Sequence, residues 1–172
     1  MSQASPQLPS CRTIDLPVLE LTAERFAPYG SVIAPTADGA RLEDAPLDLS
    51  AGRPRFYAMR LHARGLTVTA ITRHRRVTQA LASVGGHTWF LAVAPPFAVD
   101  DPAAEPALDD IRAFRIPGDM AIMLRRGTWH AGPLFEGGEQ SFFNLELADT
   151  NDTDHHTSDL VARYGCALHL RA

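Results

Sequence analysis

Apolar and polar positions alternate along most of the chain in short runs, and glycine or proline separates one run from the next. Short alternating runs bounded by turn residues are typical of β-strands. Many such strands with little helix between them favour a sandwich or barrel over a parallel α/β sheet. The pattern predicts strands at 56–61, 67–72, 78–84, 88–94, 111–115, 120–124 and 141–147.

Three segments outside these runs have a different pattern. Residues 22–30 predict a short helix, with Thr22 as the N-cap and Gly30 at its end. A second short helix is expected at 158–164, before Gly165. Residues 38–52 are rich in Gly, Pro, Asp and Ala, so we expect a loop and a candidate mobile flap.

Length and composition fit a compact globular protein. The chain has 172 residues, of which 45% are hydrophobic and 21% charged, and these values exclude a disordered or fibrous chain. A chain of this length usually forms one domain. We therefore expect a single domain over residues 1–172, with residues 1–15 as an extended N-terminal segment.

The charge pattern points to a small ligand. A formal net charge of −4 gives no excess of basic residues for binding phosphates, so we expect no nucleic-acid partner. The main basic cluster is the run 73–76, Arg-His-Arg-Arg. Guanidinium groups pair with carboxylates through two hydrogen bonds. This cluster therefore suits a small carboxylate substrate.

The cysteines and the N-terminus indicate the compartment. Cys11 and Cys166 lie far apart without C-x-x-C spacing, so we predict two free thiols. Residues 1–10 lack the basic start and apolar core of a signal sequence. The most apolar stretch, 89–99, is interrupted by two prolines. We expect a cytoplasmic protein with no membrane partner.

The strongest chemical signal is a histidine that follows a glycine turn. Gly127 and Thr128 precede Trp129 and His130. Histidine is the usual proton carrier near neutral pH and a common metal ligand. Glu146 and Asn144 lie on the same face of a predicted strand, since residues two apart point the same way. A Glu146 carboxylate that faced His130 would act with it as a catalytic base or as a pair of ligands.

The second of two glycine-turn segments resembles a motif of the cupin superfamily, whose small β-barrels hold a metal or ligand on their inner walls. Gly118, Asp119, Gly127 and His130 have the order of the second cupin motif, in which the histidine points into the barrel. The resemblance implies an all-β fold, a cupin-like β-barrel (double-stranded β-helix) with a few short peripheral helices.

The first segment is a degenerate form of the other cupin motif. His74, Arg76, Gln79 and Gly86 stand where metal-binding cupins carry His, His, Glu and Gly. The resemblance implies a divalent metal site formed by His74, Gln79 and His130. A neutral amide binds a divalent cation more weakly than a carboxylate does, so Gln79 either binds the metal weakly or hydrogen-bonds the ligand.

More specifically, the chain resembles the ureidoglycolate lyase family over most of its length. The similarity rests on residues 21–22, 26–30, 55–56, 73–74, 78–79, 90–95 and 127–130. It implies a carbon–nitrogen lyase that splits ureidoglycolate into glyoxylate and urea in the breakdown of allantoin. It also implies a homodimer, and nickel or a similar ion as the metal.

The expected roles in this reaction follow from residue type. His130 is the predicted base, acting directly or through a metal-bound species, and Glu146 and His74 are further catalytic candidates. Arg55 and Arg73 are expected to hold the substrate carboxylate. His74 and Gln79 complete the metal site or orient the ligand, and Trp129 lies in the core or forms a pocket wall that contacts the substrate. His155 and His156 lie in a polar segment and are expected on the surface.

Two other functions stay open. After His130 the family usually carries a second histidine, whereas this chain has Ala131-Gly132-Pro133. The first alternative is a metal-dependent cupin that acts on another small 2-oxo or 2-hydroxy acid. The second is a non-catalytic cupin that binds a small carboxylate.

Overall fold

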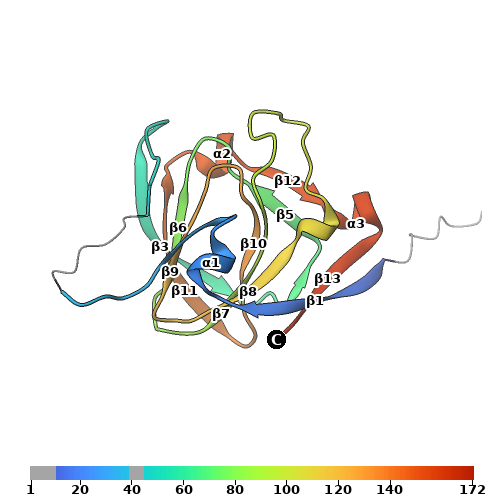
Figure 1. Cartoon of the computed structure of the whole chain (residues 1–172), viewed down its shortest axis with the longest axis horizontal. Helices are drawn as coiled ribbons and strands as arrows, with labels where there is room; N and C mark the ends of the chain where they lie inside the picture. The colour runs from blue at the N-terminus through green and yellow to red at the C-terminus, as the bar shows by residue number, and fades with distance from the viewer. Residues whose placement is uncertain (1–10, 39–44) are drawn as a thin grey trace, which may run out of the picture.

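The protein is built from two β-sheets that face each other (Figure 1). The structure is a computed structural model that describes residues 11–38 and 45–172. The larger sheet is curled into a half-barrel, and the helices are short. The predicted all-β, cupin-like fold is confirmed.

The larger sheet has eight strands. In chain order they are β1 (Arg12–Glu20), β4 (Thr67–Val68), β5 (Ala70–Arg73), β7 (Trp89–Ala94), β8 (Arg112–Ile116), β10 (Trp129–Leu134), β12 (His156–Asp159) and β13 (Cys166–Arg171). Their order in the sheet is β12-β5-β10-β7-β8-β1-β13-β4. β1 lies between β8 and β13 and is parallel to both, so the first described strand is an inner strand of the sheet.

The smaller sheet has five strands. They are β2 (Gly30–Ile33), β3 (Pro54–His62), β6 (Gln79–Ser83), β9 (Ala121–Leu124) and β11 (Glu139–Leu147), in the order β2-β9-β6-β11-β3. All its pairings are antiparallel, and the longest runs between β11 and β3. β3 therefore forms one edge of this sheet.

The described residues form three short α-helices outside the strands: α1 (Ala23–Phe26), α2 (Thr150–Thr153) and α3 (Leu160–Tyr164), with a 3-10 turn at Leu108–Asp110. The Thr22 hydroxyl accepts a hydrogen bond from the Arg25 N–H, as predicted for the N-cap of α1. Gly165 ends α3 at φ +64°, a left-handed conformation that favours glycine. Among the described helices, none is long and apolar enough to cross a membrane.

Side chains pack on both faces of the larger sheet. Between the two sheets, Leu91 and Phe114 of the larger sheet pack with Leu81, Ile122 and Phe142 of the smaller one. The opposite face of the larger sheet forms a second cluster, enclosed by its own curl and by α3. Since successive residues of a strand point to opposite faces, β7 and β8 supply buried residues to both clusters.

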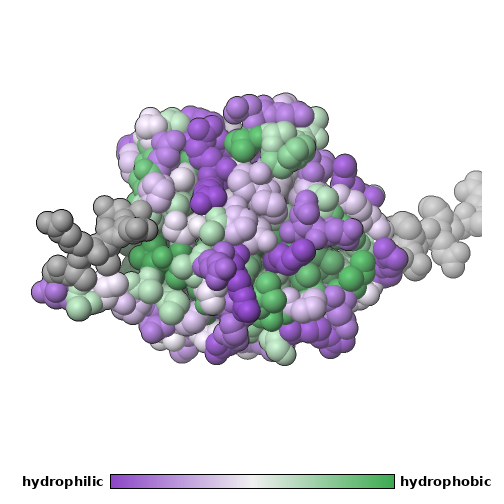
Figure 2. Space-filling model, viewed as in Figure 1, coloured by the Kyte–Doolittle hydropathy of each residue, from purple (hydrophilic) through white to green (hydrophobic). Residues whose placement is uncertain are grey.

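The outer surface mixes polar and apolar side chains. On the face shown in Figure 2, hydrophilic residues cover much of the surface, and smaller hydrophobic patches lie between them. Such a mixture is ordinary for a domain that faces water. Both cysteines are free, as predicted, with Cys11 exposed and Cys166 buried.

The structure corrects several predicted elements. The run 67–72 is two strands, because the pairing changes at Thr69 from β13 to β12 and β10. The helix predicted at 158–164 begins only at Leu160, because Asp159 ends β12 and caps α3. Gly30 starts β2 rather than ending a helix. Glycine is required there because a Cβ would lie 1.7 Å from the Met123 carbonyl oxygen.

Five strands were not predicted: β1, β2, β10, β12 and β13. β10 contains Gly132-Pro133, which has the composition of a turn, and β12 is polar. The extended segment predicted at 1–15 falls partly outside the described residues, and from Arg12 it is strand β1.

The predicted flap at 38–52 also falls partly outside the described residues, which omit 39–44. Its later part is tied to the smaller sheet. The Asp48 N–H donates to the Thr78 hydroxyl at 2.8 Å, and the Thr78 N–H donates to the Asp48 carbonyl at 3.2 Å. Residues near Asp48 are therefore held next to the start of β6.

Candidate active site

Four of the predicted site residues line one cavity of about 160 Å³ between the two sheets. His74 follows β5, His130 lies on β10, Gln79 begins β6, and Glu146 lies on β11. The cavity wall also includes Tyr57, Asn144, Arg64, Asn151 and His155. The fold thus brings together residues from both glycine-turn motifs and from the predicted strand that carries Glu146.

The glycine turn before His130 also holds the segment that carries His74. Gly127 has φ +79°, and a Cβ there would lie 2.6 Å from the Val99 side chain, so only glycine fits. The Gly127 N–H donates to the His74 carbonyl at 2.7 Å. The Thr128 hydroxyl donates to the Tyr29 carbonyl at 2.7 Å. These bonds set the distance of 5.1 Å between the centres of the two imidazole rings.

His130 is neutral near pH 7. Burial, together with the nearby His74, lowers the pKa of His130 from 6.5 to about 3. Its Nδ1 lies 3.2 Å from the Thr128 carbonyl oxygen, which can only accept a hydrogen bond. The proton is therefore on Nδ1, and Nε2 carries a lone pair.

His74 has the same tautomer. Its Nδ1 lies 2.7 Å from the carbonyl oxygen of Asp154, so Nδ1 carries the proton and Nε2 the lone pair. Burial lowers the pKa of His74. The Asp154 carboxylate accepts from the backbone N–H groups of Arg75 and Arg76, each at 2.7 Å. Asp154 thus fixes both the turn after β5 and the His74 ring.

Glu146 is a buried carboxylate with only 1% of its surface exposed. The Tyr57 hydroxyl donates to its Oε1 and the Gln79 amide donates to its Oε2, both at 2.9 Å. Burial, followed by the hydrogen bond to Glu146, raises the pKa of Tyr57, so the phenol keeps its proton. Among the described residues that line this cavity, Glu146 is the one carboxylate.

Arg73 and Trp129 lie outside the cavity, although their chain neighbours His74 and His130 line it. Residues next to each other along a strand point to opposite faces, and Arg73 and Trp129 lie on the outer face of the larger sheet. There the Arg73 guanidinium lies 4.7 Å from the centre of the Trp129 ring. It donates to the carbonyls of Phe97 and Asp101 and, through Nε, to His156.

This arrangement corrects the assignment of Arg73 as a carboxylate clamp. Its side chain is fully buried and its donors are used within the protein. Trp129 is also buried. It lies in the core and packs against both Arg73 and His156 rather than forming a wall of this cavity. His156, expected on the surface, is half-buried in the same cluster.

Arg55 lies near the rim. It pairs with Glu146 across β3 and β11, so both side chains point to the same side of the smaller sheet. Its guanidinium lies 3.9 Å from the centre of the Tyr57 ring, and the residue is exposed. Arg55 is therefore close to the cavity through Tyr57 but does not form part of its wall.

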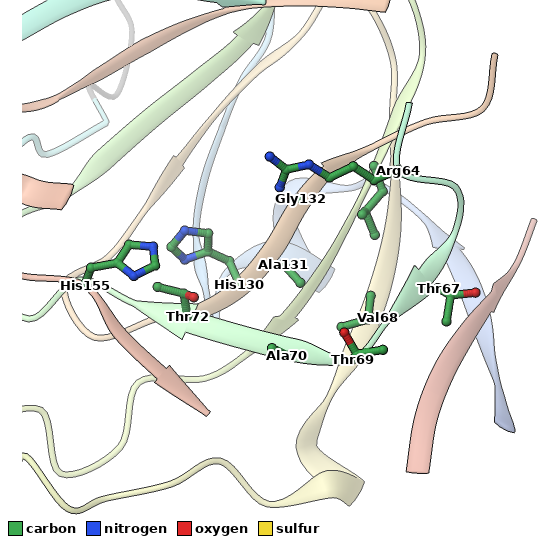
Figure 3. A pocket seen from close by; sticks show the side chains of 11 residues that line it. Arg64, Thr67, Val68, Thr69, Ala70, Thr72, His130, Ala131, Gly132 and His155 are labelled. Atoms are coloured by element: carbon green, nitrogen blue, oxygen red, sulfur yellow. The ribbon is translucent and has the colours of Figure 1, made fainter. Parts of the chain in front are cut away.

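Sequence reasoning missed Arg64 and His155, which connect this cavity to a second one of about 350 Å³. Figure 3 shows His130 and His155 at one end of the second cavity, with Arg64 reaching towards them. The His155 ring centre lies 5.8 Å from that of His74. His155 is exposed, as expected. It lies at the opening of the site because the residue before it, Asp154, is held by its hydrogen bonds to the turn after β5.

The metal ligands implied by the cupin resemblance were His74, Gln79 and His130. Both imidazoles are neutral, each holds its Nδ1 proton against a backbone carbonyl, and each leaves Nε2 available, as metal-binding histidines do. Among the described residues, no group of three His, Cys, Asp or Glu side chains is arranged to hold a metal ion. The predicted metal site therefore consists of two imidazole nitrogens and one neutral amide.

The shifted pKa of His130 predicts an acid-sensitive stability. Unfolded His130 binds its proton near pH 6.5 and folded His130 only near pH 3, so protons favour the unfolded chain below pH 6.5. Between pH 7 and pH 5 this residue is expected to lower the free energy of unfolding by about 2 kcal/mol. Urea unfolding of the wild type and His130→Gln, with chelator present, measures the difference.

His87→Gln, at a histidine outside both cavities that His130 lines, is the control for this experiment. We expect its pH dependence to match that of the wild type, and that of His130→Gln to be weaker. Equal pH dependence in all three proteins would show that His130 does not titrate differently in the folded and unfolded chain.

Comparison with known proteins identifies the family. A family model described as ureidoglycolate lyase matches residues 13–162. A ureidoglycolate lyase of Burkholderia cepacia is 34% identical to this chain, over 67% of the chain and 70% of the relative. Because the family model covers most of the sequence, this chain belongs to the ureidoglycolate lyase family.

Proposed function

We propose that this protein cleaves ureidoglycolate to glyoxylate and urea. Membership of the family makes a lyase acting on a small molecule the expected class. The observation that carries the specific proposal is the buried Glu146 carboxylate in a cavity with two neutral imidazoles. Such a cavity provides a proton acceptor and hydrogen-bond acceptors for a substrate that bears a hydroxyl and a ureido group on one carbon.

We assign the role of proton carrier to Glu146, the one carboxylate among the described residues that line the cavity. A histidine with a pKa of about 3 holds a proton poorly, so His130 is better suited to accept a hydrogen bond from the substrate hydroxyl. In the proposed reaction Glu146 accepts the hydroxyl proton, the carbon–nitrogen bond breaks, and the carbon becomes the aldehyde of glyoxylate. The same proton then passes to the departing nitrogen of urea, so no water is consumed.

Arg64 replaces Arg73 in the proposed binding of the substrate carboxylate. It is exposed, it lines both cavities, and its guanidinium can pair with a carboxylate at the opening. Arg55, stacked on Tyr57 near the rim, adds positive charge on that side.

Replacing Arg64 by glutamine is expected to raise KM for ureidoglycolate by about tenfold to a hundredfold, because a hydrogen-bonded charge contributes about 1.5–3 kcal/mol. We expect kcat to change much less, since Arg64 is assigned to binding. Arg60→Gln, at an exposed arginine on β3, is the matched control and should leave KM unchanged. Steady-state kinetics measure both constants, and an unchanged KM in Arg64→Gln would contradict the assignment.

A divalent cation would be held by Nε2 of His74 and Nε2 of His130. Gln79, the third predicted ligand, takes its other predicted role and hydrogen-bonds the substrate through its amide oxygen. It would polarise the substrate hydroxyl and make its proton easier to remove. In that case Nε2 of His130 would hold the cation instead of accepting from the substrate hydroxyl, and Glu146 would still carry the proton. Elemental analysis of the purified protein tests this metal set, and abundant iron with oxygen uptake would favour a different reaction on a 2-oxo or 2-hydroxy acid.

The experiment that tests the function is a urea-release assay with purified protein and ureidoglycolate, run with and without chelator. Release of urea and glyoxylate in equal amounts is expected. If no urea is released but glyoxylate raises the melting temperature, the protein is a carboxylate-binding member of the family instead.

We also propose a homodimer, and β3 offers a surface for it. β3 is an edge strand with unpaired backbone groups, and edge strands are ready sites for pairing with another chain. Phe56 is 67% exposed and stacks on Phe143, which is 39% exposed. Sedimentation of the wild type and of Phe56→Glu tests this, and the variant is expected to shift towards the monomer.

A further inference from the structure

Two amide oxygens beside Glu146 have no hydrogen-bond partner within the described part of the chain. They are Gln79 Oε1 and Asn144 Oδ1, and both are buried. The two side chains are 7% and 3% exposed, and both line the cavity that holds Glu146. Most buried polar atoms in proteins are paired, so two unpaired acceptors in one cavity require an explanation.

The Glu146 carboxylate determines which way each amide points. An ionised carboxylate only accepts hydrogen bonds, so the Gln79 group 2.9 Å from Oε2 is the NH₂ group, and the Gln79 oxygen faces away. The Tyr57 hydroxyl gives its one proton to Oε1. It can then only accept from Asn144, whose NH₂ lies 3.0 Å away. Both amide oxygens are thereby left as free acceptors.

The lower part of this cavity therefore presents acceptors. Beside the two amide oxygens are the Nε2 lone pairs of His74 and His130, whose Nδ1 protons are bound to backbone carbonyls. An unpaired buried acceptor has lost its hydrogen bonds to water, and a ligand with N–H groups removes this cost when it binds. A carboxylate has no N–H group and would be repelled by Glu146.

We infer that Gln79 and Asn144 bind the ureido end of the substrate and give the site its specificity for ureido acids. A ureido group has one internal N–H and a terminal NH₂, which match acceptors at the bottom of the cavity. The carboxylate end then lies towards Arg64 at the opening. This inference rests on the proposed function and adds the direction in which the substrate lies.

The inference is tested by binding, with ligands that cannot be cleaved because they lack the hydroxyl. N-carbamoylglycine has the ureido and carboxylate groups, whereas N-acetylglycine has a methyl group in place of the terminal NH₂. Isothermal titration gives the affinity of each ligand for the wild type, Gln79→Met and Asn144→Leu. Each substitution keeps a similar volume and removes the acceptor.

Gln140→Met is the matched control. Gln140 lies on β11, as Asn144 does, and its Oε1 is also buried and unpaired, but it does not line the cavity. Thermal unfolding of each variant shows whether it is folded. Asn144→Leu leaves both direct hydrogen bonds to Glu146 in place, so it serves as the test if Gln79→Met is unfolded.

We expect the wild type and Gln140→Met to bind N-carbamoylglycine at least tenfold more tightly than N-acetylglycine. Asn144→Leu and Gln79→Met are expected to lose most of this preference while their affinity for N-acetylglycine changes little. Equal affinities in the wild type, or a preference retained in the folded cavity variants, would overturn the inference. Neither result depends on turnover, so a wild type that shows the preference but releases no urea would refute the proposed reaction alone.

Discussion

Replacing Glu146 by glutamine is expected to lower kcat for urea release by a factor of about 10² to 10⁴, the usual contribution of a positioned general base. Glutamine has nearly the same shape, so the cavity keeps its size. Glutamine cannot take up the hydroxyl proton, however. Its NH₂ group is a donor and would face another donor, either the Tyr57 hydroxyl or the Gln79 NH₂ group. The loss therefore falls on the chemical step more than on substrate binding. Steady-state and single-turnover kinetics separate the two.

Glu139→Gln is the control for this substitution. Glu139 lies on β11, as Glu146 does, but it is exposed and pairs with His62 at the far end of the strand. Its variant should keep the wild-type kcat. If Glu146→Gln retained more than about a tenth of the wild-type kcat, Glu146 would not be the proton carrier, and His130 would again be the leading candidate.

Replacing Asp154 by alanine is expected to lower the free energy of unfolding by about 3 kcal/mol, because two charge-assisted hydrogen bonds are lost. The carboxylate is 5% exposed and holds the N–H groups of Arg75 and Arg76. Without it, these two N–H groups lose their partner and the turn after β5 loosens. Urea denaturation measures the change.

The same substitution is expected to lower kcat, because the turn also sets the position of the His74 ring. Asp152→Ala is the matched control, since Asp152 is an exposed residue of α2. It should change stability by less than about 0.5 kcal/mol. A loss of stability in Asp154→Ala no greater than in the control would show that the carboxylate does not hold this turn.

The fold class followed from the sequence because alternation with period two, broken by glycine and proline, is a local signal. Two of the three nine-residue strands, β3 and β11, were found within about two residues at each end, whereas β1 was not predicted. β10 and β12 were missed because Gly132-Pro133 and a polar run contradict strand propensity. In these strands the neighbours in the sheet override the local preference.

Part of the site was also determined by the sequence. The glycine turn before His130 was visible because the conformation of Gly127 admits only glycine. The sequence also placed Asn144 and Glu146 on one face, because side chains two residues apart in a strand point the same way. The same repeat separates Arg73 from His74 and Trp129 from His130, so only one residue of each pair could line the cavity.

The sequence by itself determined the β-rich fold, the two motif histidines and the face that carries Glu146, because each depends on residues close together in the chain. The tertiary structure alone decided that Arg64 and His155 share the cavity, that Arg73 is enclosed behind the sheet, and that two amide oxygens find no hydrogen-bond partner among the described residues. These features depend on contacts between residues far apart in the chain. Local patterns do not contain that information, since it arises only when the two sheets close around the cavity.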